Sequence, residues 1–151
     1  MTLLTDDMRR IVREQRLAFV ATTCPDGSPN VSPKGTIDVW DGEHLVFLDI
    51  RSPRTIANLA HDPRVEVNVV DPLVRKGYRF RGTSRVLADG SEFDAVVAFF
   101  ERERGIARRR IEHVVLVRVE HASAVISPAY DEGATEDELR ARWRKRLLGE
   151  E

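Results

Sequence analysis

Short apolar segments separated by tight turns are the feature that most constrains how this chain can fold. Residues 17–23, 30–40 and 44–50 are rich in β-forming residues, and the turn sequences Pro25-Asp26-Gly27-Ser28 and Asp41-Gly42 lie between them. Turns this short join antiparallel neighbours, because a parallel pair needs a crossover of a dozen or more residues. The first third of the chain therefore predicts antiparallel strands connected by hairpins.

The rest of the sequence adds three strands and four helices to this beginning. Further strands are expected at 64–70, 78–87 and 114–119, and helices at 6–16, 53–60, 91–103 and 135–148. The caps of these helices are expected to be Thr5, Ser52, Ser91 and Thr135. Residues 71–77 are expected to form a loop, and the charged residues 102–110 a solvated connector. This order predicts one α+β domain over residues 1–151, built around a small antiparallel barrel of five to six strands with peripheral helices.

Composition excludes several classes of function. The net charge of −1 argues against a nucleic-acid partner, and no apolar run is long enough to span a membrane. The single cysteine, Cys24, cannot form an internal disulfide, and the N-terminus lacks the pattern of a signal peptide, so a cytoplasmic location is expected. The four histidines are scattered, without the spacing of a metal site, and no hydrolase triad is evident.

The segment that follows the strand at 44–50 has the pattern of an anion site. Arg51-Ser-Pro-Arg-Thr55 opens a helix, with Pro53 at its first position. A helix start presents free backbone N–H groups and the positive end of the helix dipole, which attract phosphate. The side chains of Arg51, Arg54 and Thr55 add donors at the same point. The alternative is an ordinary capped helix with solvated arginines.

A second segment is expected to face this corner. Proline and glycine interrupt the strand at Ser32-Pro-Lys-Gly35, which suggests a bulge or a close approach to the backbone. A hairpin about Asp41-Gly42 would bring Lys34 and Arg51 to the same open end. Arg79 and Arg81, on one side of a later strand, are expected either to add a polar wall or to pair across strands with Glu66.

These pieces resemble, in order and spacing, the split-barrel flavin-binding proteins related to pyridoxamine 5′-phosphate oxidase. The resemblance covers nearly the whole length and most closely concerns the small, predicted flavin-nucleotide-binding members. It is carried by Phe19-Val-Ala-Thr-Thr, Asp26-Gly-Ser-Pro-Asn30, Val31-Ser-Pro-Lys-Gly35, Val46-Phe-Leu-Asp49, the Arg51–Leu59 segment, Asp62-Pro-Arg-Val65, Gly82 and Ser127-Pro-Ala-Tyr-Asp131.

The resemblance implies an FMN-binding split barrel that forms a homodimer, with one FMN in each of two clefts at the subunit interface. By position, the phosphate would be held by Lys34, Arg51, Arg54 and Thr55, and the ring and ribityl chain would be lined by Ser32, Pro33, Lys34, Gly35, Thr36, Asp49 and Ile50. Trp143 either closes the cleft from the partner subunit or packs in a core or interface.

The implied activity is that of an FMN-binding oxidoreductase acting on an unidentified small molecule. Two alternatives stay open: a reductase that uses the deazaflavin F420, and a non-enzymatic flavin carrier. The chain departs from true pyridoxamine-phosphate oxidases in two places. It lacks their C-terminal arginine and histidine segment, and Thr55 stands where a lysine often follows the corner arginine. No catalytic acid or base is assigned.

Overall fold

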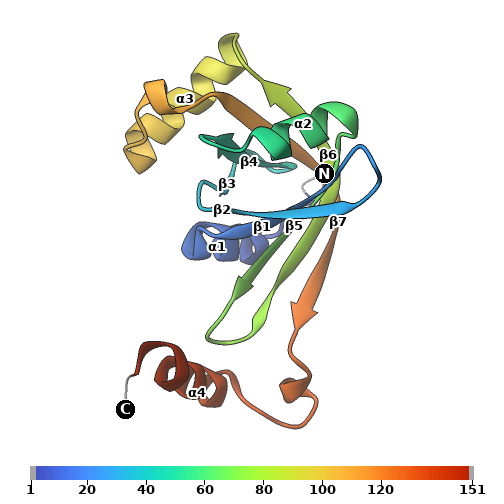
Figure 1. Cartoon of the computed structure of the whole chain (residues 1–151). Helices are drawn as coiled ribbons and strands as arrows, with labels where there is room; N and C mark the ends of the chain where they lie inside the picture. The colour runs from blue at the N-terminus through green and yellow to red at the C-terminus, as the bar shows by residue number, and fades with distance from the viewer. Residues whose placement is uncertain (1–2, 150–151) are drawn as a thin grey trace.

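The fold is a single antiparallel sheet of seven strands with helices around it, in a computed structural model that describes residues 3–149 (Figure 1). The strands follow the order β2-β1-β5-β6-β7-β4-β3. Their bounds are β1 Ala18–Thr23, β2 Pro29–Lys34, β3 Asp38–Val39, β4 His44–Asp49, β5 Arg64–Asp71, β6 Lys76–Leu87 and β7 His113–Ile126. The helices are α1 Asp6–Gln15, α2 Pro53–His61, α3 Ser91–Arg104 and α4 Glu136–Leu148, with short 3-10 turns η1 Arg108–Arg110 and η2 Pro128–Tyr130.

A three-residue link forces this sheet to curl. β2 and β3 are the two outermost strands, yet only residues 35–37 separate them in the chain. In a flat sheet of seven strands these edges would lie roughly 29 Å apart, at about 4.8 Å per strand spacing. The chain from Lys34 to Asp38 can span at most roughly 14 Å. The sheet therefore curls into a barrel that is split between β2 and β3, and the predicted α+β split barrel is confirmed.

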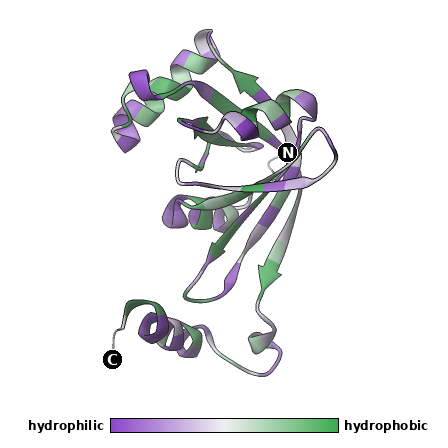
Figure 2. Ribbon diagram, viewed as in Figure 1, coloured by the Kyte–Doolittle hydropathy of each residue, from purple (hydrophilic) through white to green (hydrophobic). Residues whose placement is uncertain are grey.

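Two apolar clusters pack on the two sides of β4. Leu45 and Phe47 face the barrel interior, where they join residues such as Val20 and Phe80. Val46, Leu48 and the buried face of α3 form the second cluster outside the barrel. Burial on both faces explains why this strand is a continuous apolar run rather than an alternating one. In Figure 2 hydrophobic colour runs along the strands, whereas α4 is largely hydrophilic.

Two strand predictions need correction. Residues 30–40 form two strands rather than one interrupted strand, because the chain crosses from one edge of the sheet to the other at 35–37, which accounts for the seventh strand. The last strand does not end at Val119 but continues to Ile126. Its polar second half keeps pairing with β6 after a bulge at Arg81/Gly82, so backbone pairing overrides the weak apolar pattern. The expected loop at 71–77 is correspondingly shorter, because β5 extends to Asp71 and β6 begins at Lys76.

The residue predicted as the cap occupies the cap position in three of the four helices, and its side chain makes the capping bond in two of them. The hydroxyl of Thr5 accepts a hydrogen bond from the Met8 N–H, and Thr135 with Glu138 forms a complete capping box. The position predicted for Ser52 was correct, although it makes no capping bond, and the prediction for Ser91 was wrong. Instead, α3 has Gly90 at its cap position and no side-chain cap.

The C-terminal helix lies at the edge of the molecule, away from the other helices (Figure 1). Leu139 is its one buried residue, and the Arg75 guanidinium lies over the Trp143 ring at 3.4 Å from the centroid. Leu147 and Leu148 are 53% and 60% exposed. α4 is thus attached to the open end of the barrel by a few contacts, and Trp143 packs against its own chain. None of the helices described is long and apolar enough to cross a bilayer.

Gly82 offers a direct test of the bulge. A methyl group added there would lie 2.0 Å from the Arg118 carbonyl oxygen, so the backbone of two paired strands would have to move. We expect Gly82→Ala to lower the free energy of unfolding by roughly 1–3 kcal/mol, measured by denaturant titration. Gly35→Ala is the control, because its added methyl would meet only ordinary contact with Arg16, at 3.9 Å. Equal stability of the two variants would contradict this account.

Candidate functional site

The start of α2 presents backbone donors that the protein itself does not use. Pro53 has no N–H, and the Ser52 N–H donates to the Asp49 carboxylate at 2.7 Å. For the next two N–H groups, those of Arg54 and Thr55, no acceptor is found within residues 3–149. Because Ser52 does not cap the helix, these two donors and the positive end of the dipole stay available to an anion.

A buried lysine at the end of β2 also reaches this helix start. Lys34, the last residue of β2, is only 6% exposed, and its ammonium donates to the Ser52 hydroxyl. Burial lowers the pKa of Lys34, and the nearby Asp49 carboxylate opposes that shift. An anion at the helix start would favour the charged form of Lys34 in the same way. The predicted meeting of Lys34 with the 51–55 corner is therefore seen as a direct contact.

Asp49 is a buried carboxylate that hydrogen-bonds to two residues at the corner, Ser52 and His113. It is 1% exposed, and its second oxygen accepts from His113 Nδ1 at 2.7 Å. His113 begins β7, directly opposite Asp49 in the strand register. Ligand atoms of Asp49, His113 and Glu112 lie within 4.8 Å of one another, but hydrogen bonds already engage both Asp49 oxygens. The arrangement can therefore be satisfied without a metal ion.

Two arginines at the helix start have no hydrogen-bond or ion-pair partner among the described residues. Arg51 and Arg54 are exposed, and neither makes a hydrogen bond or ion pair with any part of the chain between residues 3 and 149. Thr55 is only 2% exposed, and its hydroxyl, which was predicted as a donor, makes no hydrogen bond with any group of residues 3–149. The corner thus combines free N–H groups with unpaired cations, a donor set suited to a phosphate monoester.

The other residues predicted to line the flavin ring and ribityl chain differ in burial and in their contacts. Ser32 is half-buried on β2, and Pro33 is exposed on the opposite face of that strand. The Thr36 hydroxyl accepts from the Leu48 N–H at 2.9 Å, so it completes the edge of β4. Ile50 packs on the cluster beneath α3. Binding of a cofactor by these residues stays a prediction.

Arg104 holds the 35–37 link in place and is an exception to the solvated connector expected at 102–110, where the other charged residues are exposed. Its side chain is only 9% exposed. It donates to the Gly35 carbonyl at 2.7 Å, to the Ile37 carbonyl at 3.3 Å and to the Asp38 carboxylate at 3.2 Å. Its charge led to the prediction of a solvated side chain, but its position at the end of α3 brings the guanidinium into contact with the link.

Arg79 and Arg81 do not reach the corner within one chain. Both lie on the outer face of β6, where their guanidinium nitrogens are 3.4 and 3.7 Å from the Glu66 carboxylate. The cross-strand alternative therefore describes their contacts. Two further strands, β5 and β1, lie between β6 and β2 in the sheet.

His113 and Arg104 are the residues that sequence reasoning missed. His113 stands 64 positions from Asp49, and Arg104 stands 69 positions from Gly35. For Asp49 and His113 the sequence held one weak signal, because each is a polar residue at the end of an apolar strand. That signal could be used only once β4 and β7 were known to be neighbours.

The chain is similar to known proteins in both sequence and fold. A family model described as pyridoxamine 5′-phosphate oxidase matches residues 4–125. An uncharacterized protein of Methanocaldococcus jannaschii is 29% identical over 89 residues, which span 58% of this chain and 58% of that protein. The structure of HupZ from Group A Streptococcus is 26% identical with a TM-score of 0.72, and the match covers 83% of this chain and 99% of that one.

More distant structures share the fold. A putative pyridoxamine 5′-phosphate oxidase from Lactobacillus delbrueckii has a TM-score of 0.70 at 24% identity, covering 82% of this chain and 95% of that one. An FMN-binding protein from Syntrophomonas wolfei has a TM-score of 0.68 at 12% identity, covering 82% and 87%. An F420 reductase has a TM-score of 0.62 at 22% identity, covering 79% and 98%. HutZ, the heme storage protein from Vibrio cholerae, has a TM-score of 0.63 at 18% identity, covering 82% and 94%.

The contribution of Arg104 can be measured against a neighbour on the same helix. We expect Arg104→Met to destabilise the protein by about 3 kcal/mol in denaturant unfolding. The change leaves buried Asp38 with only the more distant Arg13, 3.9 Å away, and two carbonyls without their donor. Arg102→Met should change stability by less than about 0.5 kcal/mol, since Arg102 is 67% exposed and pairs only with the adjacent Glu103. Similar losses for both variants would remove Arg104 from its role at the link.

Proposed function

The chain belongs to the pyridoxamine 5′-phosphate oxidase family, and on that premise we propose that it is an FMN-binding oxidoreductase acting on a small molecule. The single observation that supports this best is the start of α2. Two backbone N–H groups without acceptors in residues 3–149 lie there beside Lys34 and the unpaired Arg51 and Arg54. A phosphate monoester would satisfy these donors and neutralise these cations together.

The residues of the corner would position the cofactor rather than react. The N–H groups of Arg54 and Thr55, with the side chains of Arg51, Arg54 and Lys34, would hold the phosphate. The bound flavin would supply the hydride chemistry. Asp49 would keep Ser52 and His113 in place, and Arg104 would fix the backbone of residues 35–38, over which the flat ring would lie.

A homodimer is part of this proposal. Phe19 on β1 and Val31 on β2 are 48% and 61% exposed, and the strand register places them on the same outer face of the barrel. Apolar side chains gathered in this way favour a protein interface. Arg79 and Arg81 lie on the outer face of the same sheet, so in a dimer they would be available to the partner's cleft.

F420 is the second candidate cofactor, and one observation favours it. Arg109 and Arg110 of η1 are exposed, and neither has an ion pair among the residues described. The Glu112 N–H donates to the Asp49 carbonyl at 2.9 Å, so η1 lies next to the corner. A longer anionic tail of the kind F420 carries could use these extra cations.

The cofactor is identified by the absorption spectrum of the purified protein and by mass spectrometry of the ligand released on heating. Two visible flavin bands are expected for FMN, whereas a single band at the deazaflavin position would select F420. A Soret band would instead indicate heme, the ligand that gives the heme storage protein HutZ its description. A protein that stays colourless after incubation with FMN and with F420 would refute the proposed function.

The phosphate assignment predicts the effect of removing the two free arginines. Arg51→Ala with Arg54→Ala should weaken FMN binding by about 1–3 kcal/mol for each charged hydrogen bond lost, while the unfolding midpoint of the apoprotein stays nearly unchanged. Flavin fluorescence titration measures the affinity. Arg146→Ala, which removes an exposed arginine of α4, is the matched control. Undiminished flavin binding by the double variant would place the phosphate elsewhere.

The interface assignment predicts a change in oligomeric state. Phe19→Glu should convert the dimer to a monomer in light scattering coupled to size-exclusion chromatography, because it puts a charge into the apolar face. Leu147→Glu, at an exposed apolar residue of α4, should leave the mass unchanged. A Phe19→Glu variant that remains dimeric would show that a different surface joins the subunits.

A further inference from the structure

A separate cavity of about 280 Å³ lies at the open end of the barrel. It is bounded by α1, by the first residues of β6, by the last residues of β7 and by α4. β7 runs from His113 at the corner to Ile126 at this cavity, and a strand of fourteen residues spans about 40 Å. The cavity is therefore distinct from the proposed cofactor corner, and its size is at the small end of the range for ligand pockets.

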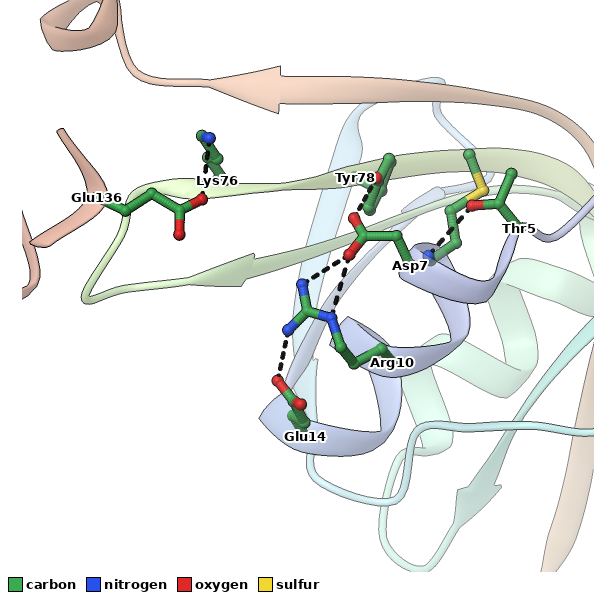
Figure 3. Close-up of polar contacts among 8 residues, drawn as sticks. Thr5, Asp7, Arg10, Glu14, Lys76, Tyr78 and Glu136 are labelled. Atoms are coloured by element: carbon green, nitrogen blue, oxygen red, sulfur yellow. Dashed lines mark hydrogen bonds and ion pairs between the residues drawn. The ribbon is translucent and has the colours of Figure 1, made fainter. Parts of the chain in front are cut away.

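Most charged groups around the cavity are paired with each other. Figure 3 shows Asp7 of α1 between Arg10 and Tyr78, whereas Lys76 meets Glu136 of α4 farther along β6. The hydrogen bond from the Tyr78 hydroxyl, followed by that from Arg10, lowers the pKa of Asp7, so this carboxylate stays ionised at neutral pH. A third carboxylate, Asp71, accepts from loop N–H groups.

Arg140 is the exception among these groups. It lines the cavity from α4 and is half-buried, yet it makes no hydrogen bond or ion pair with the chain between residues 3 and 149. A partly desolvated guanidinium without a partner is unfavourable, and its planar fork of donors matches a carboxylate. This part of the cavity is therefore suited to an anion.

One part of the wall is apolar, although charged and polar side chains make up most of the lining. Ile11 and Val74 are buried in its wall, and Ile126, which lies opposite Lys76 in the strand register, keeps 55% of its surface exposed. A ligand with an apolar body would cover Ile126 and gain free energy from that burial. Asp7, Asp71 and Glu136 line the same space, so they would repel a doubly charged phosphate more strongly than a singly charged carboxylate.

We propose that this cavity is a second ligand site, which binds a small monocarboxylate with a compact apolar body. The carboxylate pairs with the Arg140 guanidinium, and the apolar body lies against Ile126 and Val74. Such a site can hold a substrate fragment or an effector, and it does not depend on which cofactor occupies the corner.

Benzoate is the probe, and benzamide is its neutral counterpart of the same shape. The full chain with its bound cofactor is titrated with each compound while ¹H–¹⁵N NMR spectra are recorded. We expect benzoate to shift the amide signals of residues 76–78 and 136–140 and to bind about tenfold more tightly than benzamide, as loss of one charged pair requires. Signals of residues 51–55 should stay in place.

Two variants test the two halves of the site. Arg140→Gln should weaken benzoate binding about tenfold and abolish its advantage over benzamide, whereas Arg142→Gln, an exposed neighbour on α4, should change neither. Ile126→Gln should weaken both compounds several-fold, and because this side chain is exposed the variant should keep the parent melting temperature.

Several results would overturn the proposal. They are absence of benzoate binding at millimolar concentration, equal affinity for benzamide, unchanged binding by Arg140→Gln, and shifts that map to residues 51–55. None of them bears on flavin binding, which the spectrum and the Arg51/Arg54 variant test separately.

Discussion

The link of residues 35–37 is the constraint on which the rest of this structure depends. It joins the two edge strands of a seven-stranded sheet and is too short to do so unless the sheet curls. Arg104 then binds the carbonyls of Gly35 and Ile37 and the carboxylate of Asp38, so the link has one conformation rather than many. Because Lys34 directly precedes the link, the same closure carries its ammonium to the start of α2.

At the corner, the polar side chains bond to one another and leave the backbone donors at the start of α2 without acceptors. Asp49 accepts from the Ser52 N–H and from His113, and Ser52 in turn accepts from Lys34. These bonds hold the serine hydroxyl away from the helix end that it could otherwise cap. The protein thus places a buried acid beneath the site and leaves backbone donors and arginines facing outward, which is the electrostatic arrangement an anionic group needs.

Local patterns were enough to predict most elements, and the reasons for the failures are physical. The Thr135 capping box, the Pro53 helix start and the run at 44–50 each depend on neighbours within a few residues. The full extent of β7 depends on pairing with β6, and the contact of Arg104 with the link depends on packing of α3 over β4. Asp49 was placed at the site from the family resemblance, but its partner His113 was not, because strand order is set by the whole sheet. The predicted meeting of Lys34 with α2 is observed, but its cause differs in part. Of the strand expected at 30–40, only β3 pairs with β4, and closure by the 35–37 link brings Lys34 to the helix start.

The double burial of β4 has a consequence for how the protein is made. Its hydrogen-bonding partner β7 begins at His113, 64 residues after Asp49, so a ribosome releases β4 long before the strand that will cover its edge. During that interval the nascent chain exposes an apolar strand whose backbone N–H and C=O groups on one edge are unpaired. Segments of this kind are bound by chaperones and are prone to aggregation. The barrel therefore cannot be completed until the residues of β7 have been synthesised.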